Sequence, residues 1–170
     1  VYNLSYLKSM FREPMALIKG VERIQGLMVK KGNPCGVTGI ESLPGKRYVN
    51  RQRGAGTRVL LDYRLKKLGI SPEEINGYER EAGTHMAVAA AVESDSADVG
   101  MGILSAARAM NLDFIEIGPE EYDFAVPVKF LELPVVQAFI EILKSGEFHE
   151  KLEELGGYGY KRCGEVIIIR

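Results

Sequence analysis

The segment with the clearest potential for chemistry is residues 50–58, with the sequence Asn-Arg-Gln-Arg-Gly-Ala-Gly-Thr-Arg. It lies between an extended run at 47–49 and an amphipathic run at 57–68, an order that predicts a strand, a glycine turn and a helix. The first N–H groups of a helix have no acceptor within the helix, and the helix dipole adds partial positive charge there. Guanidinium groups close by suit a planar or tetrahedral oxyanion. We call residues 50–58 the Arg-Gly turn and predict that it binds a small anion.

The candidate ligand-binding residues of this turn carry either a polar side chain or a backbone amide at the turn: Asn50, Arg51, Arg53, Gly54, Gly56, Thr57 and Arg58. The phosphate-binding P-loop motif G-x-x-x-x-G-K-[ST] is not present, because Gly54-Ala55-Gly56-Thr57 is followed by Arg58. The dinucleotide fingerprint G-x-G-x-x-G is also broken, since Val59 takes its last position. The alternative to an anion site is a tight strand–helix turn with solvated arginines.

Two further glycine turns precede predicted helices. The first contributes Gly83, Thr84 and His85, and the second contributes Met101 and Gly102. A purely structural interpretation is open for each: the threonine is a good helix N-cap, and glycines after a strand allow a helix to approach closely. A general-base role for the histidine is disfavoured because no Ser or Cys nucleophile stands beside it. We therefore assign no catalytic residues.

The rest of the chain predicts strands that alternate with helices. Helices are expected at 2–12, 57–68, 85–92, 106–110, 134–145 and 147–155. Strands are expected at 16–18, 25–29, 47–49, 75–79, 97–102, 114–117, 122–127 and 166–169. This order indicates an α/β fold with helices on both faces of a sheet. Because ligands bind at the carboxyl ends of strands in such sheets, the three glycine turns are expected to line one cleft. The amides of 54–58, 83–85 and 101–103 are expected to point into it.

Composition limits the class of protein. The 170 residues include 46% hydrophobic and 26% charged residues, with a formal net charge of -1, which indicates a globular chain without direct nucleic-acid or membrane partners. Two cysteines and two histidines without metal-ligand spacing predict no metal site, and we expect no cofactor. The two cysteines are interpreted as structural, which fits a reducing compartment, and there is no apolar run of about 20 residues; together these observations favour a cytoplasmic protein.

The quoted segments carry a resemblance to a known family. Residues 25–29, the Arg-Gly turn, 83–85, 97–102 (Ala-Asp-Val-Gly-Met-Gly) and 122–124 together resemble the periplasmic-binding-protein-like (type II) domain of molybdenum metabolism. That domain is found at the C-terminus of MoeA-type molybdopterin-biosynthesis proteins and in helix-turn-helix regulators. It is similar to the type II molybdate- and tungstate-binding proteins. The Asn-Arg-Gln-Arg-Gly-Ala-Gly-Thr-Arg string is the most specific part of the match.

The resemblance implies two α/β lobes joined by two crossing strands, with a small ligand clamped between the lobes. Carried over, residues 33–121 form one continuous lobe, whereas 1–32 and 122–170 supply the crossing strands and a partial second lobe. The opening strands of the second lobe have no counterpart here. Segments 4–11, 135–143 and 166–169 are then expected to expose apolar surface, so that the chain self-associates or depends on a further N-terminal domain.

The function implied is non-catalytic binding of a small anion within a molybdenum-cofactor biosynthesis protein. Molybdate, tungstate, a pterin phosphate and a small carboxylate all suit backbone amides and arginines. The alternative is the effector-sensing domain of a DNA-binding transcriptional regulator. An enzyme acting on an anionic metabolite is a third possibility, disfavoured by the lack of a nucleophile–base pair.

Overall fold

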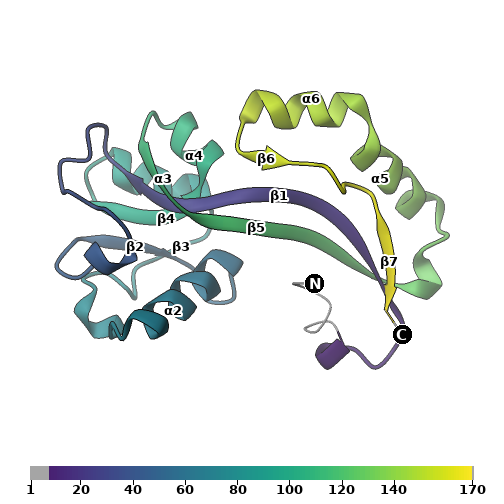
Figure 1. The fold of residues 1–170 in the computed structure, drawn as a ribbon, viewed down its shortest axis with the longest axis horizontal. Coiled ribbons are helices and arrows are strands. Elements are labelled where there is room, and N and C mark those ends of the chain that lie inside the picture. The colour runs from purple at the N-terminus through teal and green to yellow at the C-terminus, as the bar shows by residue number, and fades with distance from the viewer. Residues whose placement is uncertain (1–7, 170) are drawn as a thin grey trace. The chain divides into compact units, whose positions relative to one another are not determined.

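The computed structural model describes residues 8–169, so most of the helix expected at 2–12 lies outside the described residues. The strands are β1 (Met15–Val29), β2 (Tyr48–Arg51), β3 (Glu81–Ala82), β4 (Val99–Ile103), β5 (Asp113–Pro127), β6 (Tyr158–Gly159) and β7 (Val166–Ile169) (Figure 1). The α-helices are α2 (Gly56–Leu68), α3 (His85–Glu93), α4 (Leu104–Ala109), α5 (Pro134–Lys144) and α6 (Gly146–Leu155). Short 3-10 helices are η1 (Ile40–Ser42), η2 (Pro72–Glu74) and η3 (Val128–Phe130).

The chain forms two compact units. Unit A is Ile24–Gly118, and unit B combines the chain up to Arg23 with the chain from Pro119 onward. Both β1 and β5 pass from one unit into the other along the sequence. Each unit is described below by itself.

The sheet of unit A has the order β3-β2-β4-β1-β5. Strand β2 pairs in parallel with β3 and with β4, and β4 pairs antiparallel with β1, with Met101 opposite Leu27. Successive residues of β4 face opposite sides of the sheet: Met101 packs in the core with Leu61 and Leu65 of α2, while Gly100 faces Val88 of α3. Figure 1 shows α2 on one side of this sheet and α3 and α4 on the other. The predicted α/β fold with helices on both faces is confirmed.

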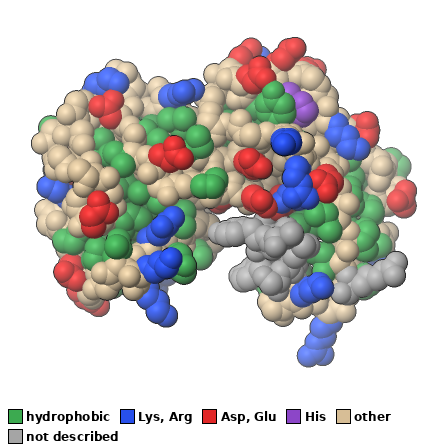
Figure 2. Space-filling view, viewed as in Figure 1, with side chains coloured by type: hydrophobic (Ala, Val, Ile, Leu, Met, Phe, Trp, Pro, Cys, Tyr) green, Lys and Arg blue, Asp and Glu red, His purple; other side chains and the backbone are tan. Residues whose placement is uncertain are grey.

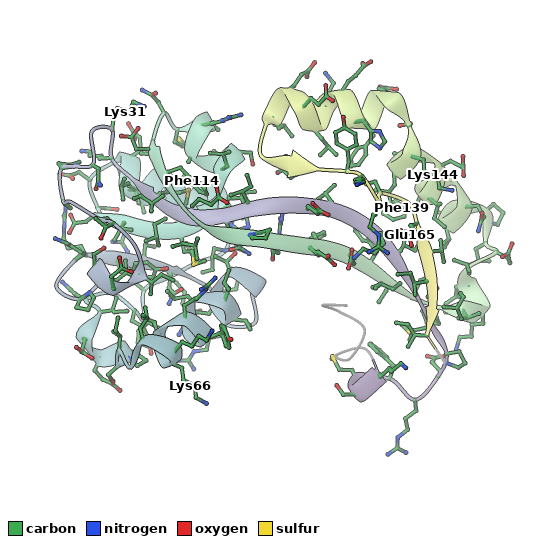
Figure 3. The ribbon with its side chains drawn as sticks, in the orientation of Figure 1. Lys31, Lys66, Phe114, Phe139, Lys144 and Glu165 are labelled. Carbon is green, nitrogen blue, oxygen red and sulfur yellow. The ribbon has the colours of Figure 1, made fainter. Side chains whose placement is uncertain are left out.

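Unit B is built on the first half of β1. Residues Met15 to Ile18 pair antiparallel with β7, and Glu22 and Arg23 pair with β6. Its core collects Ile18 with Ile140 and Leu143 of α5. Phe139 of α5, labelled in Figure 3, packs edge-on against Phe124 of β5 with ring centroids 4.8 Å apart. Several residues of segment 135–143, which was expected to expose apolar surface, therefore belong to the core of this unit.

The two long strands differ from the sequence-based expectation. The runs at 16–18 and 25–29 belong to one strand of 15 residues, β1, and those at 114–117 and 122–127 belong to a second, β5. The charged residues between the runs remain in the strands because they pair across them: Lys19 Nζ lies 2.6 Å from Glu121 and 2.7 Å from Asp123. Lys19 and Asp123 are almost fully buried, with side chains 5% and 2% exposed. The pairs compensate for burying charge inside a sheet.

The strand expected at 75–79 was wrong. Successive turn bonds, Tyr78 N–H to Ile75 O and Arg80 N–H to Gly77 O, occupy this region, and Gly77 has a φ of 91°, which a strand does not allow. The paired strand instead begins after them, as the two-residue β3. The two-residue β6 lies in a segment for which the sequence predicted no strand.

Candidate functional site

The parallel pairing of β3, β2 and β4 brings the glycine turns to one edge of unit A. Parallel strands end on the same side of a sheet, and here they are followed by α3, α2 and α4 respectively. Gln52 N–H donates to the carbonyl of Ala82 at 3.2 Å, and Arg51 Nη2 donates to the carbonyl of Gly83 at 3.2 Å. A Cβ built on Gly102 would lie 3.5 Å from His85 Nδ1. The three turns are therefore neighbours, although the direction of their amides stays a prediction.

The Arg-Gly turn leaves the start of α2 without a side-chain cap. Gly54 has a φ of 86°, which bends the chain after β2, and the N-cap residue is Ala55, whose methyl group accepts no hydrogen bond. The first bond of the helix runs from Val59 N–H to Ala55 O at 3.0 Å. The N–H groups of Gly56, Thr57 and Arg58 precede it, as expected for a helix N-terminus that can accept an anion. This is the feature of the edge best suited to ligand binding.

In the glycine turns at 83–85 and 101–102, several side chains stabilise the fold itself. Thr84 is the N-cap of α3, and its Oγ1 accepts from Ala87 N–H at 3.0 Å, so the structural interpretation of this hydroxyl holds. Met101 is 1% exposed and packs in the core. A Cβ on Gly102 would lie 2.5 Å from Met28 Cε, so this glycine allows close packing. Direct ligand contact by Gly83, Thr84, His85, Met101 or Gly102 stays a prediction.

The three arginines of the Arg-Gly turn lie in different surroundings. The Arg53 side chain is 74% exposed and its Nη2 donates to Glu79 at 2.8 Å, while Arg51 is half-buried beside Gly83. The Arg58 side chain is only 5% exposed. Of the three arginines, Arg53 is solvated, whereas Arg58 belongs to the interior of unit A.

Arg58 is held by two neighbours within its own unit. Its guanidinium lies over the ring of Tyr78, 4.0 Å from the centroid, and its Nε donates to Asp62 at 3.1 Å. The Tyr78 hydroxyl donates to the same carboxylate at 2.7 Å. Burial and the hydrogen bond to Asp62 raise the pKa of Tyr78, so the phenol keeps its proton.

Asn50 acts as a scaffold residue in this structure. Its side chain is buried, with Nδ2 donating to Tyr78 O at 3.0 Å and Oδ1 accepting from Arg51 N–H at 3.0 Å. These bonds fix the end of β2 against the segment that leads into β3. Asn50 thus positions the Arg-Gly turn, and direct contact of its amide with a ligand stays a prediction.

Carboxylates beside the arginines were missed by the sequence reasoning. Glu79, Glu81 and Asp62 all lie within ion-pair distance of Arg53 or Arg58. Only Asp62 had a sequence signal, because it stands four residues after Arg58 on the same helix face. Figure 2 shows the same mixing of signs, with Lys and Arg side chains interspersed with Asp and Glu on the viewed face. The edge is thus less cationic than its arginines suggest.

Among residues 8–169, no three His, Cys, Asp or Glu side chains come together in a group that could hold a metal ion. None of the helices in the same range has the length and apolar character of a membrane span.

The sequence matches the family described as "PBP superfamily domain" over residues 1–144. The chain belongs to the PBP superfamily. This agrees with the periplasmic-binding-protein-like fold that the resemblance implied, and the family is one of ligand-binding domains.

Relatives of this PBP superfamily chain include "Uncharacterized protein YvgK" of Bacillus subtilis (strain 168). The two are 40% identical over 170 residues, which covers 98% of this chain and 54% of YvgK. The chain thus spans about half the length of this relative.

Two solved structures are similar in fold. An ancestral arginine-binding protein bound to arginine has a TM-score of 0.55 and 22% identity, covering 80% of this chain and 61% of that one. The structure of L-phospholactate-bound PEB3 has a TM-score of 0.59 and 16% identity, covering 84% of this chain and 67% of that one. At these identities the likeness supports the type II periplasmic-binding-protein fold and carries no ligand assignment.

Proposed function

We propose that this PBP superfamily domain binds a small anion, without catalysis, at the edge of unit A formed by the Arg-Gly turn and residues 81–85. The observation that carries the proposal is the uncapped first turn of α2. Its N-cap Ala55 offers no acceptor, so the amides of Gly56 to Arg58 are available to an anion beside a buried guanidinium. Arg51 supplies a second cationic group at the same edge.

The ligand class proposed is a compact oxyanion or carboxylate. Molybdate and tungstate are the first candidates because of the resemblance to molybdenum-metabolism domains, and a pterin phosphate offers the same tetrahedral oxyanion. The fold relatives add weight to a carboxylate: arginine and L-phospholactate, named with those proteins, both carry one. All these groups are recognised by the same amides and guanidinium forks.

We further propose that the domain serves a longer cytoplasmic protein of molybdenum-cofactor biosynthesis. The resemblance in the Arg-Gly turn supports a role in molybdenum-cofactor biosynthesis. The length of YvgK, of which the chain covers 54%, supports a longer protein. In the alternative, effector sensing for a DNA-binding regulator, the same edge would bind the ligand and a different neighbouring domain would respond.

The direct test is calorimetric titration of the chain with molybdate, tungstate, phosphate, lactate and L-arginine at constant ionic strength. A ligand present at a hundred times its Kd stabilises the folded protein by about 2.7 kcal/mol if it binds only the folded state. A thermal-shift screen of the same compounds therefore identifies first which class of ligand raises the melting temperature. Sodium chloride at matched ionic strength is the control for general screening. Saturable binding of one class supports the proposal, and a flat response to the whole panel contradicts it.

A further inference from the structure

Glu81 places a carboxylate between two arginines of the Arg-Gly turn. Its Oε1 lies 3.5 Å from Arg58 Nη1 and 3.6 Å from Arg53 Nε. Charge-assisted N–H···O bonds are shorter, about 2.7–2.9 Å. The carboxylate is therefore close enough to neutralise both arginines, yet it makes a short hydrogen bond with neither of these nitrogens.

The Arg58 side of this arrangement is incompletely satisfied. Its Nη1 is buried and has no hydrogen-bond partner among the described residues. The whole Arg58 side chain is only 5% exposed. Its Nε, by contrast, is bonded to Asp62. A buried guanidinium N–H without an acceptor is costly, so a better acceptor at this position would be bound favourably.

The Glu81 side chain is free to leave this position without disturbing the fold. Glu81 stands on β3, where its backbone is held opposite Asn50, but its side chain is 33% exposed. A rotation about its side-chain bonds would carry the carboxylate into solvent. The backbone of Ala82 and Gly83, which binds the Arg-Gly turn, would keep its hydrogen bonds to Gln52 and Arg51.

We propose that Glu81 is an internal competitor for the ligand: its carboxylate takes the place of the ligand's anionic group between Arg53 and Arg58, and ligand binding displaces it. This inference rests on the proposed anion site. It makes Glu81 the residue that sets affinity and selects against weak anions. Only an anion that makes the short bonds missing here, to Arg58 Nη1 and the first-turn amides of α2, displaces the carboxylate.

Glu79 provides a matched control two residues before Glu81, in the turn that precedes β3. It bonds Arg53 at 2.8 Å, but both side chains are largely exposed, at 70% and 74%, and no ion pair joins it to Arg58. Exposed pairs of this kind contribute little. Removing the charge of Glu79 changes the net charge of the chain as much as removing that of Glu81, so general electrostatic attraction is the same in both variants.

The experiment is titration of the parent chain, Glu81→Gln and Glu79→Gln with molybdate and sulfate at low ionic strength. Glu81→Gln is expected to bind at least one of these oxyanions about tenfold more tightly than the parent, because the anion no longer has to displace a charged carboxylate that lies 3.5 Å from Arg58 Nη1. Glu79→Gln should stay within about twofold. Glu81→Ala, which removes the carboxylate altogether, should act in the same direction, and circular dichroism confirms that each variant is folded.

The outcomes separate the two proposals. A parent chain that binds, with a Glu81→Gln variant that binds equally or more weakly, overturns the competitor role and leaves the anion site standing. Binding by Glu81→Gln where the parent shows none supports the competitor role strongly. Absence of oxyanion binding in every variant removes both proposals for oxyanions.

Discussion

The guanidinium of Arg58 lies over the ring of Tyr78, 4.0 Å from its centroid, and both side chains bond the same carboxylate, Asp62. This arrangement fixes the guanidinium plane at the start of α2. It leaves Nη1 as the edge facing Glu81. One arginine thus supports the fold on one side and offers a cationic edge on the other.

Arg58→Ala should destabilise unit A far more than Arg53→Ala. The first change leaves Tyr78 and Asp62 without their buried cation and should lower the free energy of unfolding by about 3 kcal/mol, the low end of the range for broken buried pairs, because the Asp62 side chain is 44% exposed. The second removes an exposed ion pair with Glu79 and should change it by less than about 1 kcal/mol. Urea unfolding of both variants measures the difference. Equal effects would mean that Arg58 is not a structural cation.

Arg51→Ala should weaken ligand binding while leaving stability nearly unchanged. Its guanidinium is half-buried at the same edge, and losing a charge-assisted hydrogen bond to the ligand should cost about 1.5–3 kcal/mol of binding free energy. Titration with the ligand that the panel selects measures this loss. Arg51→Lys, which keeps the charge but not the fork, should recover part of it. Parent-like affinity in Arg51→Ala would assign this arginine to the turn alone.

Gly26→Ala and Gly102→Ala test two close approaches in the same sheet. A Cβ on Gly26 would lie 2.3 Å from the carbonyl oxygen of Ile115 and 2.6 Å from the ring of Phe114, labelled in Figure 3. A Cβ on Gly102 would meet Met28 Cε at 2.5 Å, and a methionine end can move aside. We expect overpacking to lower the free energy of unfolding by about 1–3 kcal/mol in Gly102→Ala. The loss should be larger in Gly26→Ala, because the backbone carbonyl of Ile115 cannot move aside as a methionine end can. Thermal unfolding that ranks them in the reverse order would contradict this account.

Asp123→Ala should lower the unfolding free energy by about 3 kcal/mol or more, because it leaves the buried Lys19 with a single carboxylate, Glu121. Breaking the exposed pair of Lys129 with Glu13 by Lys129→Ala is the control and should cost less than about 1 kcal/mol. Urea unfolding at neutral pH distinguishes the two.

The same network sets a dependence on alkaline pH. Burial lowers the pKa of Lys19, but hydrogen bonds and charges of Asp123 and Glu121 outweigh it and raise the pKa above 10.5. A group whose pKa is higher in the folded state than in the unfolded state contributes its full stabilisation at pH values below the unfolded-state pKa. This stabilisation is lost as the pH rises through the folded-state pKa. Stability should therefore hold from pH 7 to 10 and fall above it, with a smaller fall in Asp123→Ala. A fall of equal size in both would exclude Lys19 as the source.

Self-association is expected through the apolar side chains that unit B exposes on α5. Val135 and Ile142 stand two helical turns apart and are 71% and 57% exposed. Light scattering should give a mass above that of one chain, falling in the double variant Val135→Glu with Ile142→Glu. Residue Val59, 58% exposed on α2, is the matched control position for a glutamate. A clean monomer of the parent at high concentration would contradict the expectation.

Local pattern alone determined much of this protein. The Arg-Gly turn between a strand and a helix, the Thr84 cap of α3, the N1 proline of α5 and the alternation of strands with helices were all predictable. Each depends on residues within about one or two turns of each other: spacing of apolar side chains, a capping hydroxyl, a glycine in a bend. The resemblance to the PBP superfamily also rests on such short segments.

Side-chain contacts between residues far apart in the sequence were determined only by the tertiary structure. Lys19 interrupts an apolar run, and the sequence does not show that Asp123, 104 residues later, allows it to stay within a continuous strand. Nor does residue type tell the buried Arg58 from the exposed Arg53, five positions apart in one turn. Helix phase and the return of the chain through Tyr78 to Glu81 decide that difference, because burial and charge neutralisation depend on which groups other segments bring close.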